Sequence, residues 1–98
     1  MKDPRRSRHL FDLGRFVVDP EVAELLSYAD VRRLVERHAR GDWGEVSAER
    51  KAMNDAFAHP KNRSRDSSAQ SVHVVSNAQI CTITRQTKKR RYTRLFLL

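Results

Sequence analysis

The chain has 98 residues, of which 39% are hydrophobic and 33% charged, and its formal net charge is +8. This size predicts one domain with a modest core. No apolar run approaches the roughly 20 residues that span a bilayer, which argues against a membrane helix. The basic N-terminus is not followed by the apolar stretch of a signal peptide. We therefore expect a cytoplasmic protein with no membrane partner.

The residues that bind metals or cofactors are few and badly spaced. Cys81 is the one cysteine and cannot form an intrachain disulfide. The histidines, His9, His38, His59 and His73, have neither helical i, i+4 spacing nor zinc-finger spacing. The chain also lacks a Gly-rich phosphate loop and a Gly-x-Ser-x-Gly turn. We expect no metal and no cofactor, and we expect Cys81 to be a small buried residue.

Hydrophobic periodicity divides the chain into an arm and one domain. Residues 1–12 show no periodicity and predict a flexible basic arm. Residues 13–98 predict a single α+β domain with helices over about 20–59 and a three-stranded antiparallel meander over about 71–98. Two or three N-terminal helices would pack on one face of this meander, and its other face would meet solvent.

Start and stop signals define the expected helices. Asp19 and Pro20 are an N-cap and a first-position proline, and Asp30 and Ser47 are N-caps for a second and a third helix. Pro60 ends the third helix. The apolar stripes expected to face the core are Val22, Leu25, Leu26 and Ala29, then Val31, Leu34, Val35 and His38, then Met53, Ala56 and Phe57.

Runs of β-branched residues define the expected strands. Residues 72–75, 80–84 and 92–98 have this composition, with a tight turn at 76–78. Residues 61–70 read as a polar linker. Residues 13–18 suit a short strand or an extended lead-in. The apolar C-terminal run must be tied into the sheet.

The segment from His38 to Gly44 holds the only Trp and two of the three Gly. Gly41 follows a basic helix end and suits the left-handed position that terminates a helix, and Gly44 allows a second turn. Trp43 is then either a core side chain whose indole N–H finds an acceptor or an exposed recognition anchor. We expect His38 to be a half-buried structural histidine, and the Asn54 amide to bond the loop that carries Trp43.

Several of these features together resemble small bacterial proteins described as plasmid-related, which occur with plasmids and integrative elements. They are the segments 13–18 and 80–84, the Arg-His-x-x-Gly-Asp-Trp-Gly string at 37–44, Asn54, and the strand with Thr93, Leu95 and Leu97. The resemblance implies an accessory protein of a mobile genetic element. Those proteins tend to carry acidic residues where this chain has Arg85 and Lys88, and Trp where it has Cys81.

Positive charge is concentrated toward the ends of the chain. Residues 16–60 carry six Lys/Arg against nine Asp/Glu, whereas residues 61–98 carry nine against one. Such segregation predicts a polyanionic partner, either nucleic acid (DNA or RNA) or an acidic protein surface. We expect a binding protein, with its cations on phosphates. The candidate binding residues are Arg85, Lys88, Lys89, Arg90, Arg91 and Arg94 in a basic C-terminal β-hairpin, and Lys2, Arg5, Arg6 and Arg8 in the arm.

Two other functions fit parts of the same pattern. A basic hairpin together with Trp43 could dock on a host defence complex, as a protein-binding inhibitor of the anti-CRISPR or antirestriction type. A small RNA-cleaving toxin would need proton donors beside a phosphate that cations hold. His73, Arg85, Tyr92 and Arg94 are the residues that could converge for that chemistry. The pattern indicates no particular oligomeric state.

Overall fold

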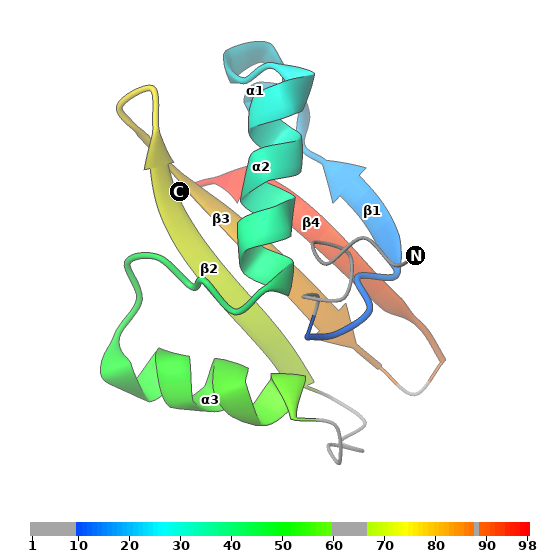
Figure 1. Ribbon diagram of the computed structural model, residues 1–98. Helices are drawn as coiled ribbons and strands as arrows, with labels where there is room; N and C mark the ends of the chain where they lie inside the picture. The colour runs from blue at the N-terminus through cyan, green and yellow to red at the C-terminus, as the bar shows by residue number, and fades with distance from the viewer. Residues whose placement is uncertain (1–9, 60–66, 88) are drawn as a thin grey trace, which may run out of the picture.

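A computed structural model describes residues 10–59, 67–87 and 89–98 (Figure 1). The elements in chain order are β1 (Arg15–Val18), α1 (Pro20–Leu25), α2 (Tyr28–Ala39), α3 (Ala48–Ala58), β2 (Ser67–Val75), β3 (Ala78–Gln86) and β4 (Arg91–Leu97). The strands form one sheet in the order β1-β4-β3-β2. β1 runs parallel to β4, and the other two pairs are antiparallel.

The expected three-stranded antiparallel meander is wrong, because the sheet is mixed and has four strands. The fourth strand is β1, a four-residue segment that local pattern does not separate from an extended lead-in. Its parallel partner β4 lies about 75 residues further along the chain. β4 is therefore a central strand, and its apolar end is tied in as expected, with the Leu98 N–H bonded to the Gln79 carbonyl at 3.0 Å.

The β2–β3 hairpin is longer than its β-branched run. β2 begins at Ser67 rather than at Val72, so residues 67–70 of the expected linker belong to the sheet. The hairpin turns at Ser76 and Asn77, which have φ of 52° and 62°. Two consecutive positive φ values match the type I′ turn that favours two-residue hairpins. The expected tight turn is confirmed.

Helix starts follow the predicted signals in two of three cases. α1 begins at Pro20, as expected, but the Asp19 side chain makes no capping bond. α2 is capped by Ser27, whose Oγ accepts from the Asp30 N–H at 3.1 Å, so the Asp30 cap was wrong. The first stripe is shorter than predicted, because α1 ends at Leu25 and leaves that side chain 42% exposed.

α3 starts at the predicted cap but buries a different face. The Ser47 Oγ accepts from the Arg50 N–H, as expected. Asn54 and Phe57 are the buried residues, whereas Met53 is exposed. α3 ends at Ala58, and Pro60 lies outside the described residues.

The Asn54 amide explains this rotation of α3. It donates to the Gln70 carbonyl at 2.6 Å and accepts from the Gln70 N–H at 2.9 Å. Asn54 therefore satisfies the outer edge of β2, as buried backbone groups require. The expected bond to the Trp43 loop was wrong, since the partner is β2.

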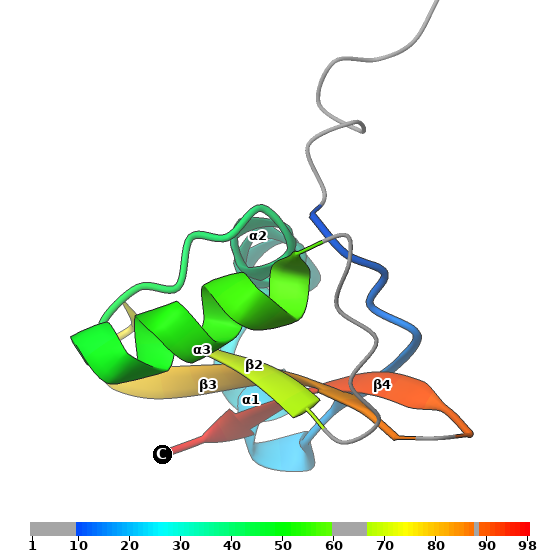
Figure 2. The same ribbon diagram turned by 90° about the horizontal axis from the view of Figure 1, so that it is seen from below.

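The helices pack on one face of the sheet, which we call the covered face. Figures 1 and 2 place α2 and α3 on the same side of the strands. The larger core cluster there comprises Val22, Leu26, Val31, Leu34, Ile80 and Leu95, and the smaller one comprises Trp43, Phe57 and Ala69.

Trp43 is a core residue. Its side chain is 3% exposed, and its Nε1–H donates to the Asp55 carboxylate at 2.9 Å. This bond is the main reason that the pKa of Asp55 lies below its usual value. Gly41 and Gly44 have φ of +87° and +70°, so both glycines occupy the positive-φ positions expected of them.

Residues 10–12, which the sequence assigned to the flexible arm, pack on the domain. The Leu10 N–H donates to the Ala39 carbonyl at 2.7 Å. The Phe11 ring stacks on Trp43 with centroids 6.1 Å apart and meets Phe57 edge-on at 5.3 Å. Phe11 therefore extends the smaller core cluster.

A chain of hydrogen bonds crosses the covered face. The Thr93 hydroxyl donates to the Leu13 carbonyl at 2.7 Å, so it must accept from the Thr84 hydroxyl, which lies 2.7 Å away. Thr84 must then accept from His38 Nε2–H at 2.9 Å, and His38 Nδ1 accepts from the Ser71 hydroxyl at 2.7 Å. His38 is fully buried rather than half-buried, and this network defines one neutral tautomer.

Candidate functional site

The second face of the sheet, which we call the open face, carries the strand side chains that alternate with those on the covered face. Figure 2 shows α2 and α3 on the other side of the strands. This face is covered in part, because Cys81 on β3 is only 3% exposed and the charge of Arg50 on α3 lowers its pKa against the effect of burial. None of these described strand residues is acidic. They are Arg15, Val17, Ser68, Gln70, Val72, Val74, Gln79, Cys81, Ile83, Arg85, Tyr92, Arg94 and Phe96.

One row across this face combines two arginines and a tyrosine. Tyr92 on β4 lies opposite Arg15 on β1 and opposite Arg85 on β3. Side chains directly opposite on adjacent strands have Cβ atoms about 5 Å apart. Both arginines are exposed, and neither makes an ion pair with a described residue. We call this set the Arg–Tyr row.

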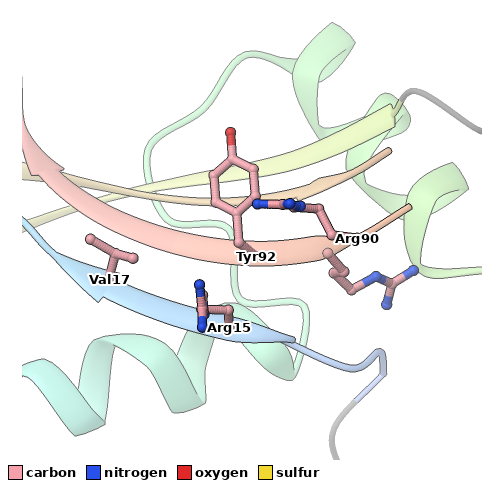
Figure 3. A pocket seen from close by; sticks show the side chains of 5 residues that line it. Arg15, Val17, Arg90 and Tyr92 are labelled. Carbon is pink, nitrogen blue, oxygen red and sulfur yellow. The ribbon is translucent and has the colours of Figure 1, made fainter. Parts of the chain in front are cut away.

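A groove of about 320 Å³ opens beside the row. It is lined by Arg15 and Val17 from β1, by Arg91 and Tyr92 from β4, and by Arg90 from the loop before β4. Figure 3 shows Arg15, Val17, Arg90 and Tyr92 in front of the strands, with the helices behind the sheet. The volume falls within the range of small-ligand pockets, about 300–1,000 Å³.

Arg91 is engaged in contacts within the fold. Its Nε donates to the Gln86 side chain at 2.6 Å, and another guanidinium nitrogen donates to the Asp12 carbonyl at 2.8 Å. The guanidinium also lies over the Phe57 ring, 5.1 Å from its centroid. Arg91 therefore joins the N-terminal segment, the hairpin and α3.

Arg94 is also paired. Two guanidinium nitrogens contact the two carboxylate oxygens of Asp19 at 2.8 Å each. This bond is the largest cause that lowers the pKa of Asp19, and it raises the pKa of Arg94. The Arg94 guanidinium lies over the Phe96 ring, 5.3 Å from its centroid. Its charge is thus largely neutralised within the protein.

The free cations of the predicted hairpin set are Arg85, Lys89 and Arg90, which are exposed and form no ion pair within the described residues. Lys88 and the arm residues Lys2, Arg5, Arg6 and Arg8 lie outside the described residues. The structure adds Arg15 and Tyr92 to the site. Arg15 joins through the long-range pairing of β1 with β4, so only the strand signal at 13–18 pointed to it. Tyr92 lies in the strand that the sequence predicted over 92–98.

The residues proposed for RNA cleavage do not converge. His73 on β2 points to the covered face and is 3% exposed, whereas Arg85, Tyr92 and Arg94 point to the open face. His73 Nε2 lies 3.5 Å from the Asp42 carboxylate. Burial and the Arg37 charge nevertheless lower the pKa of His73, with Asp42 acting in the opposite direction.

The other reactive side chains are held in inert forms. Burial lowers the pKa of His38 to about 3, so its ring is neutral at pH 7. Burial raises the pKa of the Cys81 thiol to about 11, and the expectation that Cys81 is buried is confirmed. No three His, Cys, Asp or Glu side chains gather as a metal site among the residues that the structure describes.

Comparisons with known proteins add no family to this geometry. No family model, curated protein or solved structure matches the chain. The resemblance to plasmid-related proteins therefore stays a prediction. Across residues 10–59, 67–87 and 89–98, no helix is long and apolar enough to cross a membrane.

Proposed function

We propose that this protein binds nucleic acid through its open face and the adjoining β3–β4 loop. The Arg–Tyr row carries the proposal, because it presents two unpaired guanidinium groups on either side of an aromatic ring. Arg90 in the groove and Lys89 in the loop extend the positive surface. Arginine and lysine side chains on phosphates supply most sequence-independent affinity for nucleic acids.

The distribution of charge favours the open face, rather than the helical side, as the surface that binds nucleic acid. Residues 16–60, which include all three helices, carry more acidic than basic side chains. Helical arginines such as Arg37 and Arg40 pair with Asp42 and Glu36. A polyanion would therefore be attracted to the sheet side of the molecule and repelled from the helical side. From the resemblance we carry over only the setting, an accessory protein of a mobile genetic element.

The test removes the unpaired cations and leaves the structural ones. The variant Arg15→Ala/Arg85→Ala/Arg90→Ala retains Arg91 and Arg94, whose loss would disturb the fold. Binding of a labelled ten-nucleotide single strand is followed by fluorescence anisotropy at several salt concentrations. We expect affinity to fall more than about tenfold and the salt slope to become shallower by about 2, since each phosphate contact contributes about 0.7.

A matched control removes the same charge from the helical side. Arg32→Ala/Arg33→Ala/Arg40→Ala takes two exposed arginines from α2 and one from its C-cap, and it should leave binding within about twofold. An equal loss in both variants would show that net charge alone governs binding and would contradict the proposal. If no nucleic acid binds at low salt but polyglutamate does, the partner is an acidic protein surface, as the inhibitor hypothesis requires.

A further inference from the structure

The form of the nucleic acid follows from the position of one aromatic ring, if the proposed function holds. We infer that the open face binds a single strand, with one unstacked base on the ring of Tyr92. The phosphates on either side of that base would contact Arg15 and Arg85. The ligand class is single-stranded RNA or DNA rather than a duplex.

Tyr92 has a ring that is available to a ligand. Its side chain is half-buried, and it makes no hydrogen bond or ring contact within the described part of the chain. Phe96, two positions further along the same face of β4, differs because the Arg94 guanidinium already lies over its ring. Aromatic rings on a sheet that carries flanking cations bind unstacked bases through their π-faces.

The groove beside Tyr92 gives the base a defined place. Val17 supplies an apolar wall, and the guanidinium groups of Arg15 and Arg90 lie at its sides. Arg91 also lines the groove, but its bonds to Gln86 and to the Asp12 carbonyl hold it in place. One wall of the groove is thus rigid, which lowers the entropy cost of binding.

The sheet geometry disfavours a duplex. Reading bases inside a duplex requires an element that enters a groove, such as a helix or a two-stranded ribbon. Tyr92 lies on a central strand with β1 on one side and β3 on the other, so its ring does not project from a ridge. A base that is already unstacked can reach it, whereas a base paired within a duplex cannot.

The experiment compares ligands of equal length with variants of one side chain. Ten-nucleotide oligouridylate, oligothymidylate, an abasic ten-mer and a ten-base-pair duplex are titrated into the full chain at fixed salt. We expect the single strands to bind more tightly than the duplex. Tyr92→Leu should weaken them about 5- to 150-fold, the effect of one stacked base, whereas Tyr92→Phe should retain the affinity. The abasic ten-mer should not distinguish Tyr92→Leu from the unaltered protein.

The outcomes separate this inference from the proposed function. If Tyr92→Leu binds every ligand as the unaltered protein does, while the triple arginine variant loses affinity, the stacking inference is overturned and the proposed function stands. If no ligand binds at low salt, both fail. A preference for oligouridylate over oligodeoxyuridylate of the same length, which differ only in the 2′-hydroxyl, would indicate a contact with that group. Circular dichroism and Trp43 fluorescence verify that each variant is folded.

Discussion

The two faces of the sheet use polar side chains in opposite ways. On the covered face, Thr84 and Thr93 are fully buried and linked to His38, so every hydroxyl in that chain has a partner inside the protein. On the open face, Arg15 and Arg85 are exposed and make no ion pair with a described residue. Polar groups satisfied within the fold stabilise it, and polar groups left free are available to a ligand.

This contrast separates arginines that are bonded within the fold from exposed arginines to which the proposal assigns binding. Arg91 and Arg94 contribute contacts that hold distant segments together. Arg15, Arg85 and Arg90 make no comparable contact with a described residue, so we expect their removal to leave the fold intact. The predictions below test that separation, beginning with the largest expected effect.

Replacing Trp43 with alanine should damage the covered face most. The change removes a 3% exposed ring, its contacts with Phe11 and His38, and the bond to Asp55. We expect the free energy of unfolding to fall by about 3–5 kcal/mol. Urea unfolding measures this loss. Tyr28→Ala, at a 76% exposed aromatic, is the control and should change stability by less than about 0.5 kcal/mol.

Lowering the pH should destabilise the protein through protonation of His38 on the covered face before the carboxylates become protonated. His38 has a pKa of about 3 in the folded protein against 6.5 for a free histidine. Because the folded-state pKa is the lower one, this stability is present above pH 6.5 and is lost as the pH falls. We expect a loss of about 2 kcal/mol between pH 7 and pH 5 from His38, with a further loss from His73. Urea midpoints that stay constant over this range would contradict a buried neutral His38.

Two threonines on the same face of β3 provide a matched pair. Thr84 bonds His38 and Thr93, whereas the buried Thr82 hydroxyl has no partner among the described residues. Thr84→Val should cost about 1–3 kcal/mol, because it leaves the His38 N–H unsatisfied. Thr82→Val should be neutral or stabilising. Equal losses in the two variants would mean that the network contributes nothing beyond burial.

On the open face, replacing an arginine that has no ion pair with a described residue should leave stability unchanged. Arg85→Ala removes an exposed side chain with no ion pair among the described residues, so we expect a change within about 0.5 kcal/mol. The same variant should weaken oligonucleotide binding. Arg94→Ala is the informative partner, because it also breaks the bidentate pair with Asp19. Thermal unfolding of both variants should show a lower midpoint for Arg94→Ala only.

The local signals of the sequence predicted much of the helical half. The structure has the predicted helix starts at Pro20 and Ser47, the predicted positive-φ glycine at Gly41, and the predicted buried stripe of Val31, Leu34 and His38. These features could be predicted because caps, turns and i, i+3, i+4 contacts involve residues that are neighbours in the sequence. The loop pattern left Trp43 open between a core side chain and an exposed anchor, and the structure decides for the core, with its indole N–H bonded to Asp55.

The sheet was harder to predict for two reasons. One of its strand pairs is long-range, and the polarity of a strand residue does not tell which face of the sheet it lies on. Nothing local connects β1 with β4 across the three helices. Alternation by hydrophobicity would bury Ile83 on β3, yet the structure leaves it partly exposed and buries Thr82 and Thr84 completely. For Thr84, His38 on α2 supplies a hydrogen-bond partner that no strand residue reveals.

The arginines that the sequence nominated for binding divide into two groups in the structure. Arg85 and Arg90 are exposed, and their role in binding stays a prediction. Arg91 and Arg94 carry structural bonds instead, because Asp12 and Asp19 approach them only after folding. Arg15 joins the site through the same unpredicted strand pairing.

The measurement that tests the central claim most directly is amide chemical-shift mapping of the ¹⁵N-labelled protein with ten-nucleotide oligouridylate. We predict that the largest shifts fall in β1, at Arg85 on β3, and from Lys89 to Tyr92, and that the exposed side of α2 stays unperturbed. The shifts should grow as salt is lowered. Largest shifts on α2 or α3, with the Arg–Tyr row unchanged, would contradict binding at the open face.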